Sequence, residues 1–562
     1  MPEITINGKK CTFEQGQTIL QVANDHKVEI PYYCYHDGLS IVASCRICLV
    51  EVWAPNPRND NKLEPIPKLL PSCQTTAGDG QVVRADSPKA VQSQKMVMED
   101  LLINHPLDCP VCDQSGECYL QDYSYKYGRG VSRFEEQKVK QPKKDLGPNV
   151  YLYADRCIMC TRCTRFTREV SGTAELMVAG RGNQTQIDVF PGHALDNELA
   201  SNVIDICPVG ALLDKDFLFA QRVWYLKSTP SIDGITASGD NIWIEHNEGK
   251  IYRLKPRTNL EVNKWWITDE VRYGWKHIHA ENRLRSPMRR RHGALSECDF
   301  NRAYDDALAG LSQAAESGGR LAALISPMLS CEDAFLLARL VRAIDDKAIL
   351  ALGPVPRQDE DKVFPPNLDA NNPKAFVMRA EKAPNARGVR RVLEAVNGGS
   401  VDDFNTFLQR LSRGEAKGLI LTGNYPSDWA TDKLRAAAAD ETTYTVLIDT
   451  LAGPLVDSAQ TILPGATWAE KAGTFENDRN RLQAFEQAIP VIEMAKSEGQ
   501  IALDMLARLE QGVEARAPMY NAANVRMEMA ETHPDTLGVF TKDVHLPLID
   551  AHHEPDMQVV EL

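Results

Sequence analysis

The sequence predicts a multidomain protein of mixed α/β and α+β class, with a metal-binding N-terminal part and an α/β C-terminal part. Its 562 residues exceed the usual size of one domain. Twelve of its fourteen cysteines lie before position 208, and the other two are Cys298 and Cys331. After about residue 295, helix and strand patterns alternate, as in a parallel sheet built from βαβ units.

The composition is that of a soluble globular protein, with 43% hydrophobic and 25% charged residues. The net charge of −14 argues against general nucleic-acid binding. No apolar run approaches the roughly 18 residues that span a bilayer, and no secretory signal is visible. The clustered cysteines indicate metal sites in a reducing compartment and not a disulfide scaffold. We therefore expect a cytoplasmic protein that can be peripheral to a membrane by docking on other proteins.

The first segment, residues 3–34, predicts a strand, a turn, a second strand and a helix. "EITING" and "KKCTF" flank an Asn7-Gly8 turn, the strongest short hairpin signal. "TILQVANDHKV" follows with helical spacing and with Thr18 placed as an N-cap. This order resembles the β-grasp fold of plant-type ferredoxins. The Pro-rich stretch 53–71 is expected to be a loop.

Further elements are expected along the chain. Residues 88–104 predict an amphipathic helix that ends at His105-Pro106, with Val97, Met98, Leu101 and Leu102 on its apolar side. Residues 136–149 look like a basic linker, and 242–256 predict a β-hairpin. In the α/β part we expect strands at 321–326, 348–352, 418–423 and 444–449, and a helix at 332–344. Residues 354–373 and the last fifty look irregular, the tail as a surface arm or docking segment.

The first ligand group has the order of a plant-type ferredoxin site. The usual plant-type spacing, C-x4-C-x2-C with a distant fourth cysteine, is lengthened here, because the first gap holds ten residues. Such cysteines bind a [2Fe–2S] cluster. A zinc site, which also uses C-x2-C pairs, is the alternative that the spacing leaves open. The group consists of Cys34, Cys45, Cys48 and Cys73.

The second ligand group, "HPLDCPVCDQSGEC", places four candidate ligands within fourteen residues, which suits a compact [4Fe–4S] cluster. A neutral imidazole in place of a thiolate removes one negative charge, which favours the reduced cluster. In the alternative interpretation His105 only caps the preceding helix and another group completes the site. The group consists of His105, Cys109, Cys112 and Cys118.

The third ligand group is one half of a two-cluster ferredoxin pattern. "CIMCTRC" supplies three cysteines of C-x2-C-x2-C-x3-C-P, but Thr167 stands where the fourth is expected, and Asn197, Ala200 and Val203 replace the upstream set of the other half. A Cys-Pro pair follows at Cys207-Pro208. The remaining set predicts one [4Fe–4S] cluster on Cys157, Cys160, Cys163 and Cys207.

Two further sets of residues lie near or outside these groups. Arg156, Arg162, Arg165 and Arg168 surround the third group; they could stabilise a reduced cluster or dock an acidic partner, but a solvated face is the favoured interpretation. Cys11, Cys298 and Cys331 lie outside the three groups and are expected to be small buried thiols.

The order of these motifs resembles the family of the large iron–sulfur subunit (G-type or 75 kDa) of NADH–quinone oxidoreductase, the respiratory complex I. The resemblance is most specific over 30–210, and in that family the histidine is a cluster ligand. In the C-terminal half, "ENRLRSPMRR" and "TILPGATWAEKAGTFENDRNRLQ" resemble the molybdopterin oxidoreductases. The implied domains are 1–78 (plant-type [2Fe–2S] ferredoxin), 79–119 ([4Fe–4S] domain with one histidine and three cysteine ligands), 138–217 ([4Fe–4S] ferredoxin-like), 220–276 (degenerate Mo/W-type [4Fe–4S] domain without a cluster), 277–510 (molybdopterin-oxidoreductase-like) and 511–562 (tail).

The resemblance implies one [2Fe–2S] and two [4Fe–4S] clusters that pass electrons from an NADH-oxidising flavoprotein toward a quinone site, coupled in the complex to proton translocation. The implied partners are the NADH-binding flavoprotein subunit, a small [2Fe–2S] subunit and quinone-side iron–sulfur subunits. It also implies a peripheral position on the cytoplasmic side of the inner or plasma membrane. The enzyme would be NADH:quinone oxidoreductase, a proton-translocating NADH dehydrogenase.

Some relatives carry a further cluster where this chain has Asp233, Thr236 and Asp240 in place of cysteines, so no fourth cluster is expected. No G-x-G-x-x-G fingerprint follows a strand, and Cys331 precedes a plain amphipathic helix, so neither flavin nor molybdopterin is expected.

Two other functions are compatible with parts of the pattern. The first is the electron-transfer subunit of a soluble NAD-linked hydrogenase or formate dehydrogenase. An iron-only hydrogenase would need another cysteine cluster in the C-terminal half, where only Cys298 and Cys331 are present, and a formate dehydrogenase would need a metal-binding cysteine or selenocysteine and usually the extra cluster. The second is a non-redox assembly protein, against which the three complete ligand sets argue.

Overall fold

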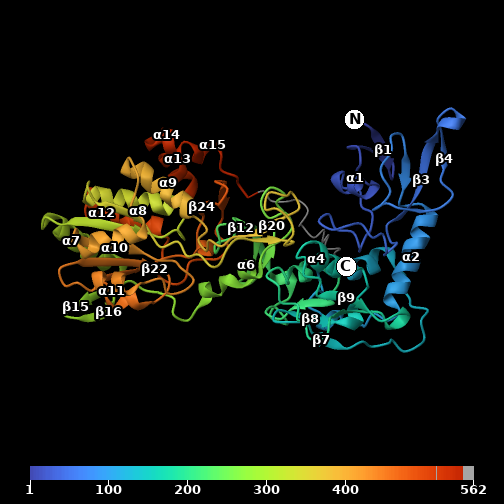
Figure 1. Cartoon of the computed structure of the whole chain (residues 1–562), viewed down its shortest axis with the longest axis horizontal. Helices are drawn as coiled ribbons and strands as arrows, with labels where there is room; N and C mark the ends of the chain where they lie inside the picture. The colour runs from blue at the N-terminus through green and yellow to red at the C-terminus, as the bar shows by residue number, and fades with distance from the viewer. Residues whose placement is uncertain (514, 548–562) are drawn as a thin grey trace. The chain divides into compact units, whose positions relative to one another are not determined.

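The computed structural model describes residues 1–513 and 515–547, which form two compact units (Figure 1). The first unit comprises 1–226 together with 363–376, and the second comprises 227–362 and the chain from 377 onward. All three ligand groups belong to the first unit. No described helix is long and apolar enough to cross a membrane.

The predicted N-terminal hairpin and helix are confirmed. Strands β1 (Glu3–Ile6) and β2 (Lys9–Thr12) pair antiparallel, with Ile6 opposite Lys9. Both turn residues, Asn7 and Gly8, have positive φ, as the tight turn between the strands requires. Helix α1 (Ile19–Asp25) begins after Thr18, whose side chain accepts a hydrogen bond from the backbone N–H of Gln21.

The prediction of a loop over 53–71 is wrong. Strand β3 (Leu49–Asn56) continues through Pro55 and forms a hairpin with β4 (Lys62–Pro65), and β5 (Leu70–Pro71) pairs with the start of β3. Beyond Trp53, β3 has a neighbour on one side only, because β6 (Val82–Arg84) pairs with residues 51–53. Proline is tolerated at such an edge, where its missing N–H breaks no ladder bond. The sheet order is β2-β1-β6-β3-β4.

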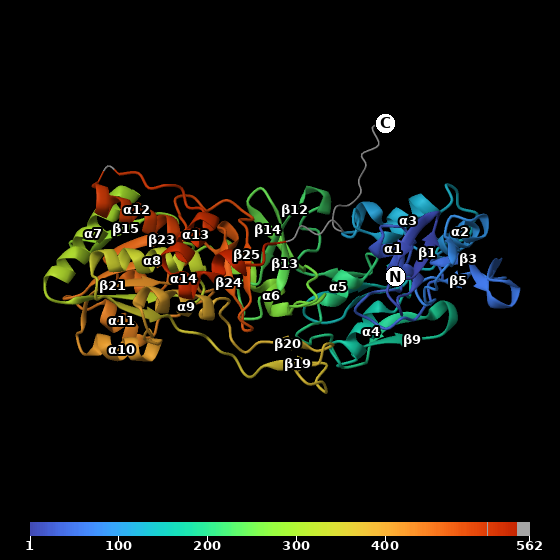
Figure 2. The ribbon, with the colours of Figure 1, turned by 90° about the horizontal axis from the view of Figure 1, so that it is seen from above.

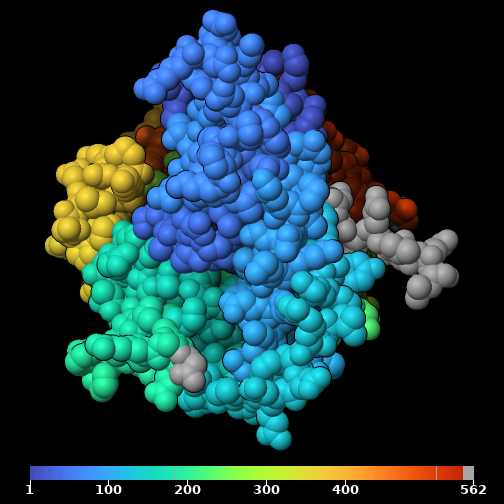
Figure 3. Space-filling view, turned by 90° about the vertical axis from the view of Figure 1, so that its right-hand side faces the viewer, coloured from blue at the N-terminus to red at the C-terminus, as the bar shows by residue number. Residues whose placement is uncertain are grey.

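The segments that carry the other two ligand groups belong to the same unit. Helix α2 (Pro88–Leu102) confirms the predicted helix, with Ala90, Gln94 and Met98 as its buried residues. The expected linker, residues 136–149, contains one short strand, β7 (Lys143–Asp145). Figure 3 shows the successive segments of the first unit, in blue, cyan and teal, packed side by side. The remaining elements are α3 (Tyr119–Tyr127), β8 (Val150–Tyr153), α4 (Arg162–Glu169), β9 (Leu176–Ala179), β10 (Gln186–Val189), α5 (Asn202–Ile206) and β11 (Leu212–Asp214).

The second unit begins with a three-stranded antiparallel sheet (Figure 2). Strands β13 (Asn241–Asn247) and β14 (Lys250–Pro256) confirm the predicted hairpin, and β12 (Lys227–Ile232) adds an edge. Helix α6 (Asp269–Tyr273) packs against β14.

A mainly parallel, doubly wound sheet forms the rest of this unit and confirms the predicted βαβ pattern. Its order is β16-β15-β23-β22-β21-β17-β18, and β15 pairs antiparallel with both of its neighbours, β16 and β23, whereas the other pairs are parallel. The strands are β15 (Met288–Arg291), β16 (Ala294–Glu297), β17 (Arg320–Ile325), β18 (Ile349–Leu352), β21 (Ala416–Thr422), β22 (Tyr444–Asp449) and β23 (Thr461–Pro464).

Apolar side chains alternate between the two faces of this sheet, so each face has its own core. Ala323 and Ile420 belong to the core under one set of helices, whereas Ala322 and Leu419 belong to the core under the other. Figures 1 and 2 show the two layers. The first layer is α7 (Phe300–Glu316), α8 (Cys331–Ile344), α9 (Ala386–Asn397) and α12 (Glu498–Gln511); the second is α10 (Phe404–Ser412) and α11 (Asp432–Ala438).

The prediction that the last fifty residues are irregular is wrong for the described part of the tail. Helix α13 (Ala522–Thr532) packs Val525 and Met529 into the core beside α8. Together with Ala522, these buried residues recur at helical spacing. Residues 548–562 of the predicted docking tail lie outside the described residues. The other elements are β19 (Lys362–Phe364), β20 (Phe376–Met378), β24 (Gly473–Glu476), β25 (Leu482–Phe485), α14 (Pro534–Leu537) and α15 (Val539–Lys542).

Candidate metal centres

The fold brings the four cysteines of the first group together in a buried site. Sγ of Cys48 lies 3.5 Å from Sγ of Cys73. The thiol of Cys34 hydrogen-bonds to those of Cys45 and Cys73, which lowers the pKa of Cys34 and raises the pKa of the other two. Three of these cysteines are buried and Cys45 is partly buried, and four sulfurs at this spacing cannot all be thiolates unless a positive charge lies between them. The donor set therefore fits a cluster of iron ions.

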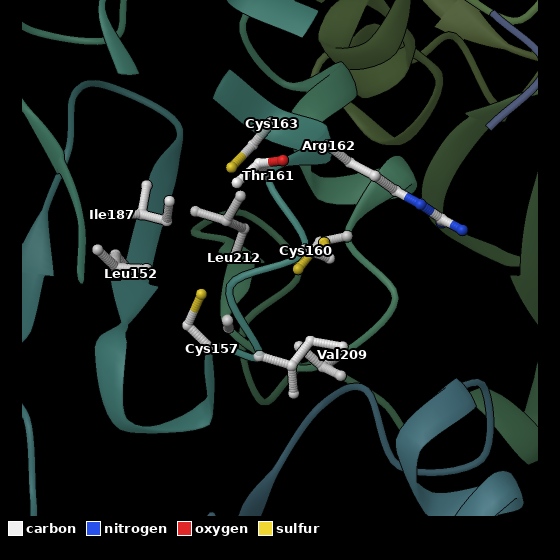
Figure 4. Close-up of a pocket in the computed structure, with 12 residues that line it drawn as sticks. Leu152, Cys157, Cys160, Thr161, Arg162, Cys163, Ile187, Val209 and Leu212 are labelled. Carbon is white, nitrogen blue, oxygen red and sulfur yellow. The ribbon is translucent and has the colours of Figure 1, made fainter. Parts of the chain in front are cut away.

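The third group lines one small enclosed cavity. Cys157, Cys160, Cys163 and Cys207 face it, and aliphatic side chains such as Leu152, Ile187 and Leu212 complete the wall. Figure 4 shows the sulfurs of Cys157, Cys160 and Cys163 directed toward the shared space, whereas the side chain of Arg162 extends away from it. Burial raises the pKa of Cys157 to about 12 and of Cys160 to about 11.

Backbone N–H groups point at the sulfurs of the third group. The N–H of Met159 donates to Sγ of Cys157 at 3.4 Å, and Cys207 accepts backbone hydrogen bonds that act against the effect of burial on its pKa. Met159 and Thr161 have positive φ, a conformation that costs about 1–2 kcal/mol for a residue with a side chain. The loop therefore holds a wrapped conformation with its donors turned inward, as sulfur ligands of a cluster require.

The second group lines a separate cavity. His105, Cys109, Cys112 and Cys118 share it with Gly210 and Arg156. A Cβ on Gly210 would lie 2.2 Å from Sγ of Cys112, so the absence of a side chain there leaves room for the sulfur. Cys109 is exposed, whereas Cys112 and Cys118 are buried. Burial raises the pKa of Cys118 to about 12.

His105 does not cap the preceding helix. Helix α2 ends at Leu102, and Nζ of Lys138 donates to the carbonyl oxygens of Leu102 at 2.7 Å and Ile103 at 2.9 Å. Burial, with the charges of Arg156 and Lys138, lowers the pKa of His105 to about 4. The imidazole is therefore neutral at pH 7, which is the form that binds metal.

The prediction of a solvated face for the arginines near the third group is wrong for three of the four. Arg156, Arg162 and Arg165 are buried, with 2%, 5% and 3% of their surface exposed. Arg156 forms an ion pair with Asp108 at 2.8 Å, and Arg162 and Arg165 bond to backbone carbonyls. Only Arg168 has an exposed side chain. These contacts join segments far apart in sequence, so no local pattern could indicate them.

The positions that lack expected cysteines are filled by packed side chains. Asn197, Ala200 and Val203 are buried, and Thr167 is fully buried in α4. In the second unit, the carboxylate of Asp233 accepts bonds from the N–H groups of Ile235 and Thr236 and the hydroxyls of Thr236 and Ser238. The loop at 233–240 is thus held by a carboxylate and not by cysteine ligands.

The cysteines outside the groups differ in burial. Cys11 and Cys331 are fully buried, as expected, and Cys298 is only partly buried. Within the described part of the chain, no three histidine, cysteine or carboxylate side chains lie close enough together to hold a single metal ion.

Five family models match the chain in succession. Their descriptions are 2Fe-2S iron-sulfur cluster binding domain (2–88), NADH-ubiquinone oxidoreductase-G iron-sulfur binding region (94–133), NADH-quinone oxidoreductase subunit 3, ferredoxin-like domain (147–213), NADH-ubiquinone oxidoreductase NDSU1/NuoG-like, 4Fe-4S domain (226–276) and Molybdopterin oxidoreductase (385–508).

Curated relatives share the same region. The mitochondrial NADH-ubiquinone oxidoreductase 78 kDa subunit of Neurospora crassa is 42% identical over 306 residues, 54% of this chain and 40% of the relative. The NADH-ubiquinone oxidoreductase 75 kDa subunit of Reclinomonas americana is 35% identical over 392 residues, 68% of this chain and 55% of the relative. The chain belongs to the family of the large iron–sulfur subunit of NADH–quinone oxidoreductases. The alignments span about half the length of these relatives.

For this member of the large-subunit family, the matches confirm the predicted fold class: a [2Fe–2S] domain, [4Fe–4S] domains and a molybdopterin-oxidoreductase-like α/β domain. A solved structure of NAD+-reducing [NiFe]-hydrogenase in the H2-reduced state is also similar. It has 29% identity and a TM-score of 0.34, covering 40% of this chain and 91% of that chain.

Proposed function

We propose that this chain is the iron–sulfur electron-transfer subunit of a proton-translocating NADH–quinone oxidoreductase. The observation that carries the proposal is that all twelve predicted ligands gather into three separate sites, each with a complete set of four. Every set belongs to one compact unit. A chain with three such sites suits the transfer of electrons between fixed centres.

We assign one cluster to each site. The [2Fe–2S] cluster would be held by Cys34, Cys45, Cys48 and Cys73, one [4Fe–4S] cluster by His105, Cys109, Cys112 and Cys118, and the other by Cys157, Cys160, Cys163 and Cys207. When bound, these clusters supply one-electron redox chemistry. The protein contributes burial, which keeps water from most of the sulfurs but not from that of Cys109, and backbone N–H groups that donate to sulfurs such as that of Cys157. His105 contributes a neutral ligand.

We propose that the chain binds neither flavin nor molybdopterin. Cys331, the thiol considered for molybdenum, is fully buried at the start of α8, where the side-chain amide of Asn385 donates to its Sγ at 3.4 Å. A metal could reach that sulfur only if the surrounding core opened. Electrons would therefore enter from, and leave to, other subunits.

The proposed partners are the NADH-binding flavoprotein subunit, a small [2Fe–2S] subunit and the quinone-side iron–sulfur subunits. The proposed position is peripheral, on the cytoplasmic side of the inner or plasma membrane. We propose the domain boundaries 1–78, 79–119, 138–217, 220–276, 277–510 and 511–562, with no cluster in 220–276. The Asp233 hydrogen-bond network supports that last point.

Metal analysis and electron paramagnetic resonance (EPR) of the anaerobically purified full chain test this proposal. We expect about ten iron atoms per chain and the signals of one binuclear and two cubane clusters. Cys163→Ser should remove one cubane signal, whereas Cys298→Ser, at a cysteine outside the ligand groups, should remove none. Zinc without iron would overturn the proposal.

Co-purification tests the place of the chain in a complex. Recovery with a flavoprotein and membrane subunits that oxidise NADH with quinone supports the proposal. Recovery with a nickel–iron or molybdenum subunit instead would show the alternative, a soluble NAD-linked hydrogenase or formate dehydrogenase.

A further inference from the structure

One nitrogen of a buried arginine contacts two different ligand groups. Nη2 of Arg165, in helix α4, donates to the carbonyl oxygen of Cys34 at 2.5 Å and to that of Cys160 at 3.3 Å. Cys34 belongs to the first group and Cys160 to the third. These two cysteines are 126 positions apart in sequence, yet a single guanidinium nitrogen joins their backbones.

Other bonds fasten the same loop to the same helix. Nη1 of Arg165 donates to the carbonyl of Ser40, and the carboxylate of Glu169 accepts from the N–H of Ser40 at 2.8 Å and from its hydroxyl at 2.6 Å. Arg162 donates to the carbonyls of Tyr35 at 2.6 Å and Ile206 at 3.1 Å, which are the residues beside Cys34 and Cys207. The contact between the two sites is therefore built from several directional bonds.

The charge of Arg165 has no carboxylate partner within ion-pair distance among the described residues. Its side chain is buried, with 3% of the residue exposed, and its acceptors are the neutral carbonyls of Cys34, Ser40, Cys160 and Thr161. A buried cation in such surroundings is costly unless negative charge lies near it. The cysteines whose carbonyls it binds would supply that charge as thiolates, and the carboxylate of Glu169 acts on the guanidinium in the same direction without forming an ion pair with it.

We propose that Arg165 is a positioning residue that joins the first and third ligand sites and raises the reduction potential of both. This inference rests on the proposed function, because it assumes that both sites hold clusters. One electron would leave one site and enter the other, with no covalent bond changed and no proton moved. The guanidinium favours the reduced state of each, since reduction adds one negative charge near a fixed positive charge. Its shared nitrogen also links the two ligand backbones through hydrogen bonds.

Redox titrations of the full chain, followed by EPR, test the proposal with three variants. In Arg165→Gln, which removes the charge, the ratio of reduced to oxidised cluster at a fixed potential should fall about tenfold at both sites, or about 59 mV for one electron. Arg165→Lys keeps the charge and should shift both less. Arg168→Gln, which removes an exposed charge from the same helix, should shift neither. The cluster on the second group should keep its potential in all three.

Three outcomes separate this proposal from the proposed function. If wild-type chain lacks the iron, the proposed function fails. If Arg165→Gln retains about ten iron atoms and both potentials stay within the Arg168→Gln values, Arg165 has no such role. If Arg165→Gln loses iron, Arg165→Lys is the test of the joining role. Reduction potentials equal to those of the wild type at both sites, together with slow hydrogen exchange in the 34–40 loop, would overturn that role.

Discussion

Gly210 and Cys112 lie in contact, since a Cβ on Gly210 would stand 2.2 Å from the sulfur of Cys112. Gly210 follows Cys207 of the third group by three residues, while Cys112 belongs to the second group. Gly210 does not have a positive φ, so an alanine there would be limited by space and not by backbone conformation. The turn after the third group thus shapes the site of the second.

Gly210→Ala should displace the sulfur of Cys112 and prevent assembly of the cluster on the second group. Iron should fall from about ten to about six atoms per chain, with one cubane EPR signal lost. Gly130→Ala is the matched control, because a Cβ there meets nothing within 4 Å. About ten iron atoms per chain in Gly210→Ala would contradict this prediction. It would show either that the sulfur of Cys112 is not a ligand or that the turn at Gly210 moves to make room for the added methyl group.

His105→Cys should lower the reduction potential of one [4Fe–4S] cluster. The neutral imidazole would be replaced by a thiolate, and the added negative charge disfavours the reduced state. The other two potentials should stay unchanged in EPR-monitored titrations. His193→Cys, at an exposed histidine outside the groups, is the control. Identical titrations of the two variants would argue that His105 binds no iron.

Local patterns predicted the elements whose stabilising contacts are close in sequence. The Asn7-Gly8 hairpin, the Thr18 cap and the βαβ strands of the second unit are such cases. The ligand groups are also visible in the sequence, because at least two cysteines of each group are separated by only two residues, although Cys73 and Cys207 follow at a distance.

Contacts between distant segments were not predictable. The burial of Arg165 depends on carbonyls in a loop about 125 positions earlier, and Lys138 caps a helix 36 positions before it. The hairpin of β3 and β4 is not predictable from the sequence, because Pro55 and Pro65 are tolerated in strands only at a sheet edge, and the sequence does not reveal which strand is at the edge. A charged residue is expected to be exposed until its partners are known.

Lys138→Met should destabilise the chain by about 1–2 kcal/mol, because two charge-assisted hydrogen bonds at the C-terminus of α2 are lost. Hydrogen exchange at the end of α2 should accelerate, and the midpoint of urea unfolding should fall. Lys140→Met, at an exposed neighbouring lysine, controls for the lost charge. Equal midpoints and equal exchange in the two variants would contradict the capping role.

The carboxylate of Asp233 predicts a pH dependence of stability. It is fully buried, and this burial raises its pKa from 3.8 to about 6 although several hydrogen bonds act in the opposite direction. The folded state therefore holds the proton more tightly than the unfolded state. The stabilisation is complete below pH 3.8 and is lost as the pH rises to about 6, by an amount on the order of 3 kcal/mol.

Asp233→Asn should remove that dependence, because an amide does not titrate and its oxygen can still accept from the N–H groups of Ile235 and Thr236. The free energy of unfolding of the wild type, relative to the variant, should fall as the pH rises from about 4 to about 6.5. Urea unfolding of both proteins across this range measures the difference, which cancels other titrating groups. Asp432→Asn is the control: its side chain is 91% exposed, so the free energy of unfolding of the wild type, relative to this variant, should change little with pH. The prediction is contradicted if the free energy of unfolding of the wild type, relative to Asp233→Asn, stays constant or rises with pH. The carboxyl of Asp233 would then be ionised already in the folded protein.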